Sequence, residues 1–282
     1  MPSPLPNTVC KLKHSLYELK QAPRVWLEKF STTLLGFSFI QSSYDPSLFL
    51  QRTSKGIMIL LVYVDDIIVT GSDQEAITTI KQLLHTTFHM KDLGQLTYFL
   101  GLEVRFQQKD IFVTQHKYTQ DLIQLAGLTT ATMVDTPMEV NVKLRQDEGG
   151  LLQDPTLYRK LIRSLIYLTI TRPDISFVVH TVSKFMQNPR HLHLTAVQQI
   201  IKYLVATPGR GLFFPAGAPI QLQAYSDTDW ARCPDTRKST TGWCMFLGDA
   251  PISWKCKKQE SVSKSSTEAE YWSMFVACSE II

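Results

Sequence analysis

Hydrophobic positions in the first hundred residues switch between helical spacing and strand spacing. Apolar side chains recur every three or four residues from Pro23 to Gly36, which predicts a helix with proline in its first turn. Short apolar runs bounded by turn residues predict three strands, which are SLFLQR, GIMILLVYV and IIVTG. Residues 73–88 return to helical spacing. Residues 95–106 alternate apolar with polar side chains, which predicts one half-buried strand.

From about residue 115 onward the pattern becomes mainly helical. A short helix at 114–128 is followed by the polar segment 136–150, which we interpret as a linker. Three further helices each stop before a proline that cannot continue them, and their ranges are 155–171, 174–187 and 191–206. The middle helix carries an apolar stripe that we expect to be buried: Ile175, Val178, Val179, Val182 and Phe185.

The last segment returns to strand-like patterns at 220–230, 241–248 and 251–258. Gly248-Asp249 predicts a tight hairpin between the second and third of these strands. SSTEAEYWSMFVACSEII then opens as a helix, and the chain ends inside it. The pattern as a whole predicts an α/β (α+β) fold.

Composition narrows the class of protein. The 282 residues are 44% hydrophobic and 19% charged, a globular profile that fits one large domain or two to three small ones. The longest apolar run, residues 57–64, is too short to cross a bilayer, so no membrane partner is expected. Five widely spaced cysteines favour a reducing, intracellular compartment and argue against zinc. The net charge of +4 permits binding to nucleic acid without arguing for it.

Two adjacent carboxylates, Asp65 and Asp66, interrupt the apolar stretch LLVYVDDIIVTG. Burying two ionised carboxylates is costly, so we expect a hairpin turn that exposes them, with LLVYV and IIVTG as its arms. Aspartate is common in such turns without any further role. The same turn would also present oxygen ligands to Mg²⁺ and polyphosphate. The residues alone leave both readings open.

YVDD between hydrophobic strands is the signature of a polymerase palm, and other stretches accompany it in a fixed order. They include SLYELKQAPRVW, KDLGQLTYFLGLEV, TPME, SLIYLTITRPDISF, YSDTDWARCPDTRKSTTGWCMFLG and SSTEAEY. On these stretches the sequence resembles the Pol polyprotein of copia-type LTR retrotransposons. The resemblance covers nearly the whole chain from Val9 onward.

The resemblance implies RNA-directed DNA polymerisation coupled to ribonuclease H. It implies a partial reverse-transcriptase palm over 1–110, a mainly helical thumb and connection over 111–210, and a truncated ribonuclease H-like module over 216–282. The implied partners are an RNA template, a DNA primer, an RNA–DNA hybrid and dNTPs, with Mg²⁺ or Mn²⁺ as cofactor. The implied compartment is the cytoplasm or the nucleus, and the oligomeric state is left undetermined.

The resemblance also assigns roles to residues. Asp65 would bind the catalytic metals with Asp66 beside it, and Asp227 and Glu268 would bind the metals of the ribonuclease H site. Nucleotide and template–primer contacts would involve Lys20, Gln21, Arg24, Tyr63, Phe99, Leu100 and Gly101. On the residues themselves, Asp227 also reads as an ordinary strand-end aspartate. Ser265 to Glu268 likewise fits an S-x-x-E capping box, which stabilises a helix start without catalysis.

Both metal sites look incomplete by this comparison. The family takes another palm aspartate from an upstream strand, whereas the first acidic residue here is Glu18. We therefore expect a fragment of a longer polyprotein, truncated at both ends and inactive by itself. The alternatives are a non-catalytic nucleic-acid-binding module, or an active polymerase completed by another chain.

Two clusters of basic residues are considered as possible binding sites. His191 and His193 lie two apart in one helical turn, so they face different directions and do not indicate a shared metal. Four lysines gather around the third strand of the last segment: Lys255, Lys257, Lys258 and Lys264. They predict either a solvated face or a contact with the backbone of an RNA–DNA hybrid.

Overall fold

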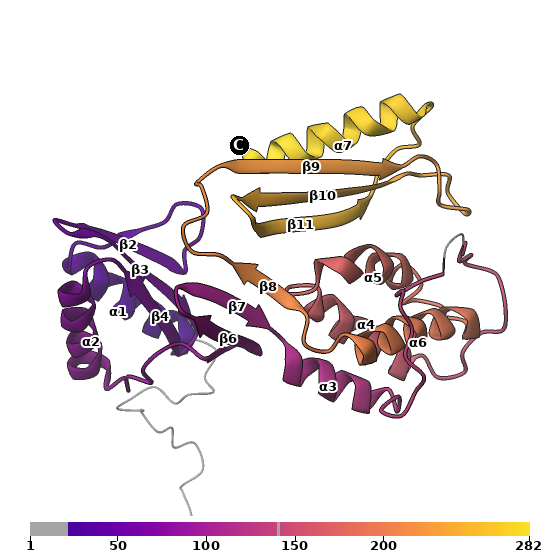
Figure 1. The fold of residues 1–282 in the computed structure, drawn as a ribbon. Coiled ribbons are helices and arrows are strands. Elements are labelled where there is room, and N and C mark those ends of the chain that lie inside the picture. The colour runs from indigo at the N-terminus through magenta and orange to yellow at the C-terminus, as the bar shows by residue number, and fades with distance from the viewer. Residues whose placement is uncertain (1–21, 140–141) are drawn as a thin grey trace, which may run out of the picture. The chain divides into compact units, whose positions relative to one another are not determined.

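The computed structural model describes residues 22–139 and 142–282 (Figure 1). Two of the predicted template–primer residues, Lys20 and Gln21, therefore lie outside the described residues. The chain divides into two compact units, Met1–Leu96 and Thr97–Ile282, and each is described by itself. This division falls inside segment 1–110, so the assignment of segments to palm, thumb and ribonuclease H stays a prediction.

The first unit is a four-stranded antiparallel sheet with two helices packed on one face. Its strands are neighbours in chain order: β1 (Ile40–Gln41), β2 (Leu48–Thr53), β3 (Gly56–Tyr63) and β4 (Asp66–Gly71). The helices are α1 (Ala22–Gly36) and α2 (Gln74–Phe88). Alternate residues of β3 supply the sheet side of the core, because successive side chains of a strand point to opposite faces: Met58, Leu60 and Val62.

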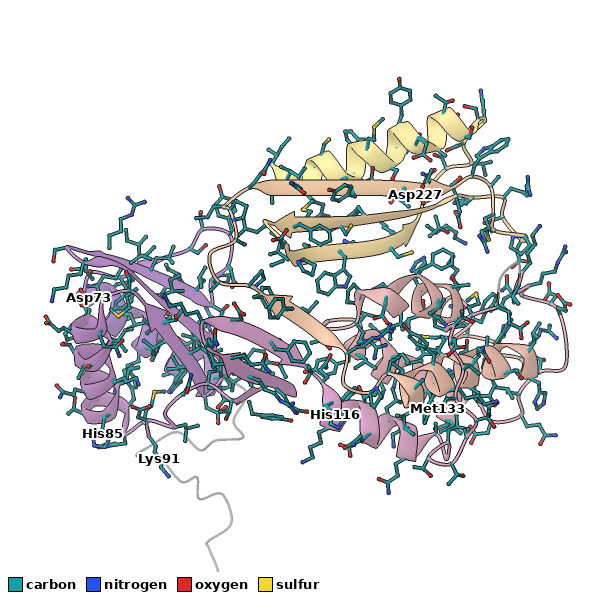
Figure 2. All side chains as sticks on the ribbon, viewed as in Figure 1. Asp73, His85, Lys91, His116, Met133 and Asp227 are labelled. Carbon is teal, nitrogen blue, oxygen red and sulfur yellow. The ribbon has the colours of Figure 1, made fainter. Side chains whose placement is uncertain are left out.

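The two helices of the first unit are fixed by aromatic packing and by a cap. Trp26 and Phe30 of α1 stack at 5.0 Å between ring centroids, and Phe88 of α2 meets Phe30 at 5.2 Å. Asp73 (labelled in Figure 2) caps α2, because its carboxylate accepts a hydrogen bond from the Ala76 amide at 3.1 Å. The helices, strands and turn predicted for residues 22–94 are thus confirmed, apart from the short additional strand β1.

The second unit begins with a sheet that combines distant parts of the sequence. Its order is β5 (Tyr98–Phe99), β6 (Leu102–Gln107), β7 (Asp110–Thr114) and β8 (Gly211–Phe214), all antiparallel. The helices between β7 and β8 are α3 (His116–Leu125), α4 (Thr156–Leu168), α5 (Ser176–Ser183) and α6 (His191–Ala206). All five residues of the predicted apolar stripe are buried, including Ile175 and Phe185, which flank α5 on either side. The side chains of Ile175 and Val182 are fully buried.

The last part of the second unit is a three-stranded antiparallel sheet with one helix on one face (Figure 1). Its elements are β9 (Leu222–Asp229), β10 (Thr240–Leu247), β11 (Ala250–Lys258) and α7 (Ser266–Ile281). Leu247 pairs with Ala250 across the two-residue turn, which confirms the hairpin predicted at Gly248-Asp249. Trp243 and Met245 of β10 pack against Ala277 of α7, so this face of the sheet is the covered one.

The prediction of a single strand over 95–106 is wrong. Leu100 and Gly101 turn the chain back, so that Phe99 pairs with Leu102 in a hairpin between β5 and β6. Both turn residues have positive φ, 48° and 79°, the signature of a two-residue turn whose twist matches that of its strands. The alternation of apolar and polar positions continues through the turn, which is why the pattern alone suggested one strand.

The architecture is mixed α/β, with seven α-helices and three antiparallel sheets in the described residues, in agreement with the predicted α/β class. The second of the three consecutive predicted helices is shorter than expected. It starts with a 3₁₀ turn at Pro173–Ile175, and α5 ends at Ser183. Within ranges 22–139 and 142–282, no helix is long and apolar enough to span a bilayer.

Candidate functional site

The carboxylates at 65 and 66 stand at the tip of the β3–β4 hairpin. Tyr63 pairs with Asp66, so that Val64 and Asp65 form a two-residue turn. Both carboxylates are exposed, which removes the cost that burial of two negative charges would carry. The predicted hairpin is therefore confirmed, and it places two adjacent oxygen donors at an open surface of the first unit.

The turn that carries them is conformationally strained. Val64 has a φ of 54°, a left-handed value that is rare for a β-branched residue. Such a conformation costs roughly 1–2 kcal/mol and persists only where the surrounding structure enforces it. Here the paired strands β3 and β4 enforce it from both sides. Strain of this kind is typical of functional turns.

The donor chemistry fits a hard divalent cation only in part. Mg²⁺ prefers carboxylate and phosphate oxygens in near-octahedral geometry, and it keeps several water ligands. Within the described ranges, no cluster of three or more histidine, cysteine, aspartate or glutamate side chains is placed to hold a metal. The two carboxylates of Asp65 and Asp66 alone are fewer oxygen donors than such an ion requires.

The other predicted nucleotide and template–primer residues fall in different parts of the chain. Arg24 is exposed in the first turn of α1, and Tyr63 is exposed at the end of β3. Phe99, Leu100 and Gly101 belong to the second unit, where they form the β5–β6 hairpin.

That hairpin is held against α4 by one side chain. The Tyr167 hydroxyl donates a hydrogen bond to the backbone carbonyl of Leu100. A Cβ atom added at Gly101 would lie 3.1 Å from the same hydroxyl, so the turn and the tyrosine are in close contact. The hairpin is therefore anchored to the helical part of the second unit.

Asp227 and Glu268 lie at neighbouring elements but on different faces. The Ser273 hydroxyl of α7 donates to the backbone carbonyl of Asp227 at 3.0 Å, which fixes α7 on β9. Asp227 pairs with Gly242, whereas Ala224 pairs with Met245 on the face that α7 covers. Since side chains alternate along a strand, the Asp227 carboxylate projects from the opposite face, near the end of β9 (Figure 2).

Glu268 takes part in the cap of α7, although its carboxylate binds the amide before the N-cap rather than the N-cap amide of a capping box. Ser265 is the N-cap of α7, and its hydroxyl accepts a hydrogen bond from the Glu268 amide at 3.1 Å. The Glu268 carboxylate in return accepts from the Lys264 amide at 2.7 Å. The structural role of this glutamate is thus present, while its predicted role as a metal ligand stays a prediction.

His191 and His193 do not share a site, because His191 is exposed whereas His193 is buried. His193 is fully buried, stacked at 3.8 Å on the Phe185 ring, and its Nε2 lies 3.0 Å from the Arg145 carbonyl. Its Nδ1 accepts a hydrogen bond from the Arg190 amide at 3.1 Å, so both ring nitrogens are occupied within the fold. Burial lowers the pKa of His193. This arrangement makes His193 a core residue.

The lysine cluster divides between two faces of the last sheet. Lys255 and Lys257 are exposed and lie near acidic side chains, with Lys255 3.9 Å from Glu280 and Lys257 3.7 Å from Glu260. Lys258 alternates to the other face and lines a cavity with Lys184 and Arg232. The sequence analysis did not group these three residues, because they are widely separated along the chain.

Comparison with known proteins identifies relatives along nearly the whole chain. Residues 4–140 match the family model described as reverse transcriptase (RNA-dependent DNA polymerase). The chain is 44% identical over 276 residues to the retrovirus-related Pol polyprotein from transposon RE1 of Arabidopsis thaliana, and 42% identical over 276 residues to that from transposon RE2. Each match covers 98% of this chain but 19% of the relative, so the chain spans about a fifth of those polyproteins.

A shorter relative is matched over most of its own length. The chain is 32% identical over 269 residues to the putative transposon Ty5-1 protein of Saccharomyces cerevisiae. That match covers 94% of this chain and 87% of the yeast protein. No solved structure matches the chain.

Proposed function

This chain belongs to the reverse transcriptase family of copia-type retrotransposon Pol polyproteins, and we propose that it supplies part of an RNA-directed DNA polymerase. Its substrates would be an RNA template, a DNA primer and dNTPs. The proposal takes segment 1–110 as part of the palm and segment 111–210 as thumb and connection. One observation carries it: the β3–β4 turn presents Asp65 and Asp66 side by side, exposed, on a strained hairpin.

Asp65 acts in this proposal as the metal ligand, with Asp66 beside it. Mg²⁺ or Mn²⁺, when bound, would neutralise the charge that develops on the transferred phosphoryl group. The protein's part is to hold the two carboxylates at a fixed spacing and to keep them accessible to a triphosphate. The β5–β6 hairpin, with Phe99, Leu100 and Gly101 at its turn, would contact the primer.

Both carboxylates come from one hairpin, whereas two-metal phosphoryl transfer requires oxygen donors that clamp both ions. We therefore propose that the chain binds a divalent cation weakly and does not extend a primer unaided. The remaining donors would come from the triphosphate and from another polypeptide segment or chain. Polymerase activity would then depend on supplying that additional protein part.

Metal titration tests the carboxylates directly. Mn²⁺ binding, followed by the loss of the free-ion signal in electron paramagnetic resonance, should weaken about tenfold in Asp65→Asn, a change of ~1.4 kcal/mol. Glu28→Gln, which removes an exposed carboxylate from α1 in the same unit, should leave the titration unchanged. If both variants bind Mn²⁺ as the parent chain does, Asp65 is not a ligand.

Primer extension tests the second part of the proposal. The chain alone, given an RNA template, a DNA primer, dNTPs and Mg²⁺ or Mn²⁺, should give no extension product. Extension by the unaided chain that disappears in Asp65→Asn would support the site but refute the need for further protein donors. Extension that persists in Asp65→Asn would contradict the assignment of the site itself.

A second function, ribonuclease H, is proposed for segment 216–282. The feature in its favour is the order of three antiparallel strands followed by a helix whose first turn carries Glu268. The substrate would be the RNA strand of an RNA–DNA hybrid, with Asp227 as the partner carboxylate; because Asp227 projects from the face opposite to α7, the two carboxylates would have to reach a common ion around the end of β9. Since Glu268 also caps α7, catalysis would require its carboxylate to serve the metal as well as the Lys264 amide.

Hybrid cleavage separates this second function from simple binding. Cleavage of the RNA strand that is lost in Asp227→Asn and in Glu268→Gln would support it. Binding of the hybrid without cleavage, with affinity falling steeply as salt rises, would instead favour a non-catalytic nucleic-acid-binding module.

A further inference from the structure

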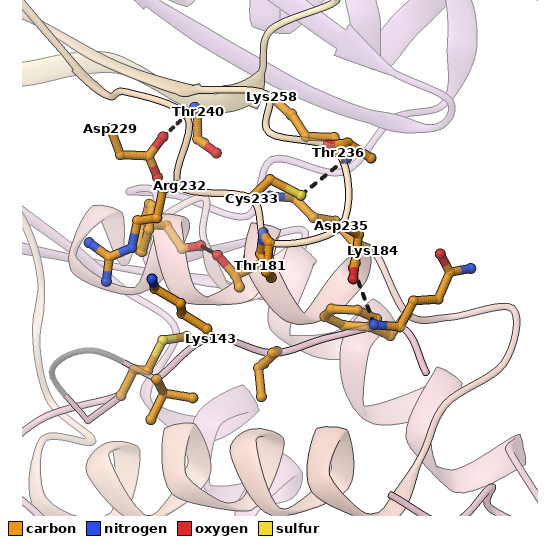
Figure 3. A pocket seen from close by; sticks show the side chains of 17 residues that line it. Lys143, Thr181, Lys184, Asp229, Arg232, Cys233, Asp235, Thr236, Thr240 and Lys258 are labelled. Carbon is orange, nitrogen blue, oxygen red and sulfur yellow. Dashed lines mark hydrogen bonds between the residues drawn. The ribbon is translucent and has the colours of Figure 1, made fainter. Parts of the chain in front are cut away.

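A cavity of about 120 Å³ lies within the second unit (Figure 3). Its walls come from α5, from the loop between β9 and β10, and from the segment that precedes α4. Four basic side chains line it: Lys143, Lys184, Arg232 and Lys258. Two acidic side chains line it as well, Asp229 and Asp235. The lining thus carries an excess of positive charge.

The acidic side chains are already engaged by backbone amides. The Asp229 carboxylate accepts a hydrogen bond from the Thr240 amide, and the Asp235 carboxylate accepts from the Gln146 amide at 3.1 Å. Burial raises the pKa of Asp229, and the Thr240 hydrogen bond and the charges of Lys184 and Arg232 only partly oppose this. Neither carboxylate is placed within ion-pair distance of a cavity lysine or arginine in the described structure.

The basic side chains of the cavity, by contrast, have few hydrogen-bond or ion-pair partners among the described residues. The side chains of Lys143, Lys184 and Arg232 make no hydrogen bond or ion pair with any described residue, although the Arg232 guanidinium lies over the Phe177 ring at 5.9 Å. The Lys258 ammonium has one weak contact, with the Cys233 sulfur at 3.9 Å. The cavity therefore collects cationic groups without an ion-pair partner among the described residues; Lys143 and Arg232 are exposed, whereas Lys184 and Lys258 are half-buried.

The positive charge of the cavity contributes to lowered pKa values of two groups, Lys184 and His180. Burial and, after it, the charge of Lys258 lower the pKa of Lys184. His180, one helical turn before Lys184, has a buried Nε2 with no hydrogen-bond partner among the described residues. Burial and then the charges of Lys184 and Lys258 lower its pKa to about 4. An anion in the cavity would offset the cost of holding these like charges close together.

We propose that this cavity binds a phosphate group through Lys184, Arg232 and Lys258. Ammonium and guanidinium groups form strong charge-assisted hydrogen bonds with phosphate oxygens. The space is several times the ~15 Å³ that one water molecule needs, so a tetrahedral oxyanion can enter. The phosphate could belong to a free anion or to a nucleic-acid strand, and the experiment below distinguishes these two sources. The site shares no residue with the Asp65–Asp66 turn, so it does not rest on the proposed polymerase role.

Cys233 provides a reporter inside the cavity. Burial by itself would raise the pKa of the Cys233 thiol, but hydrogen bonds with Thr236 and the charge of Lys258 outweigh it and lower that pKa. A bound phosphate would cover the sulfur and neutralise Lys258, and both effects slow alkylation of the thiol. Cys278 is an exposed free thiol of α7 outside the cavity, so it serves as an internal reference.

The experiment measures iodoacetamide labelling of each cysteine in the full chain by peptide mass spectrometry. The probes are inorganic phosphate, inorganic pyrophosphate and an RNA–DNA hybrid oligonucleotide, each compared with potassium chloride at the same ionic strength. At least one phosphate probe should slow Cys233 labelling threefold or more and leave Cys278 unchanged. Lys184→Gln should abolish this protection, and Lys184→Arg should retain it. Lys160→Gln, an exposed lysine of α4 outside the cavity lining, should behave as the parent does.

Each outcome decides the proposal. Protection by inorganic phosphate or pyrophosphate supports a site for the free anion, and protection by the hybrid alone supports a strand phosphate as the source. Protection that chloride reproduces, or that survives in a folded Lys184→Gln chain, overturns the proposal. Absence of protection with all three probes also overturns it. If Lys184→Gln does not fold, Arg232→Gln, on the exposed loop after β9, gives the same test.

Discussion

The stability of the second unit should depend strongly on one buried arginine between α4 and α5. The side chain of Arg172 is 1% exposed, and its guanidinium donates to both carboxylate oxygens of Asp174 at 2.9 and 2.8 Å. It also donates to the carbonyl and the hydroxyl of Thr207, both at 2.9 Å. The Tyr203 hydroxyl adds a hydrogen bond to Asp174 at 2.8 Å. This network joins the start of α5 to the end of α6.

Arg172→Met should lower the free energy of unfolding of the second unit by about 3 kcal/mol. Removing one partner of a buried ion pair costs roughly 3–5 kcal/mol, because the other charge is left uncompensated. The side chain of Asp174 is 31% exposed, so water reaches it and the lower end of that range applies. The matched control is Arg210→Met. Arg210 also approaches Asp174, at 3.9 Å, but its side chain is 61% exposed, so its removal should cost less than about 1 kcal/mol.

The assay uses tryptophan fluorescence during urea unfolding. Four of the five tryptophans lie in the second unit, so a Trp26→Phe background reports on that unit alone. A shift of the midpoint at constant m-value would give the change in stability. The reasoning is refuted if Arg172→Met and Arg210→Met have the same midpoint, or if Arg172→Met loses less than about 1 kcal/mol.

Three other predictions use the same assay. Gly101→Ala should destabilise the second unit by about 1–2 kcal/mol, and Gly217→Ala should cost less. Both glycines have a φ of 79°, but a Cβ atom at 101 meets the Tyr167 hydroxyl, whereas at 217 nothing lies within 4 Å; equal costs would contradict the contact. Ser265→Ala should cost about 1 kcal/mol through loss of the α7 cap, whereas Glu268→Gln, which keeps an acceptor oxygen, should cost less than about 0.5 kcal/mol. Stability should fall between about pH 6.5 and pH 4, because the unfolded chain protonates His180 while its folded pKa is about 4. His180→Gln should reduce that loss, and an unchanged pH profile would contradict the assignment.

Protonation of Asp174 should destabilise the second unit at a lower pH than the protonation of His180 does. Burial alone would raise the pKa of Asp174, but the hydrogen bonds and charge of Arg172, with the Tyr203 hydroxyl, outweigh it and lower that pKa. The stability that this carboxylate contributes is therefore present above about pH 4 and is lost as the pH falls through the folded pKa. Asp174→Asn should flatten the acid limb of the urea profile, and a limb of unchanged slope would show that other groups cause it.

The local sequence pattern was sufficient to predict those elements whose structure is determined by their own residues and by residues close to them in the sequence. The β3–β4 hairpin is an example, since apolar arms on both sides of Asp65 leave few alternatives to an exposed turn. The α6 helix begins at His191 and ends at Ala206 as predicted, because prolines on either side limit it. The α7 cap at Ser265 likewise follows from a four-residue motif.

Features that depend on distant segments could not be read from spacing. The sheet of the second unit pairs Val113 with Leu212, nearly a hundred residues apart, and neither segment predicts its partner. The β5–β6 turn was missed for another reason, since Leu100 adopts a left-handed conformation that leucine rarely favours. The cavity cations were not grouped because folding alone brings Lys184 beside Lys258.

The orientation of candidate ligands was also beyond the sequence. Asp227 and Glu268 are correctly placed on a strand and on the first turn of the following helix. Which face of β9 carries the Asp227 carboxylate depends on the register with β10, and a shift of one residue would reverse it. The family resemblance identifies Asp227 and Glu268 as candidate ligands. The register of β9 with β10 determines whether their carboxylates can approach each other.

Val64 gives the β3–β4 turn a stiffness that glycine would not. Glycine would adopt the same φ without steric cost, but it would also let the two strands swing relative to each other at the tip. With valine the conformational entropy of the loop is lost once, when the chain folds, so the proposed metal ligand Asp65 would stand on a backbone that is already ordered before any ion binds. Preorganisation of this kind raises affinity without adding a single contact.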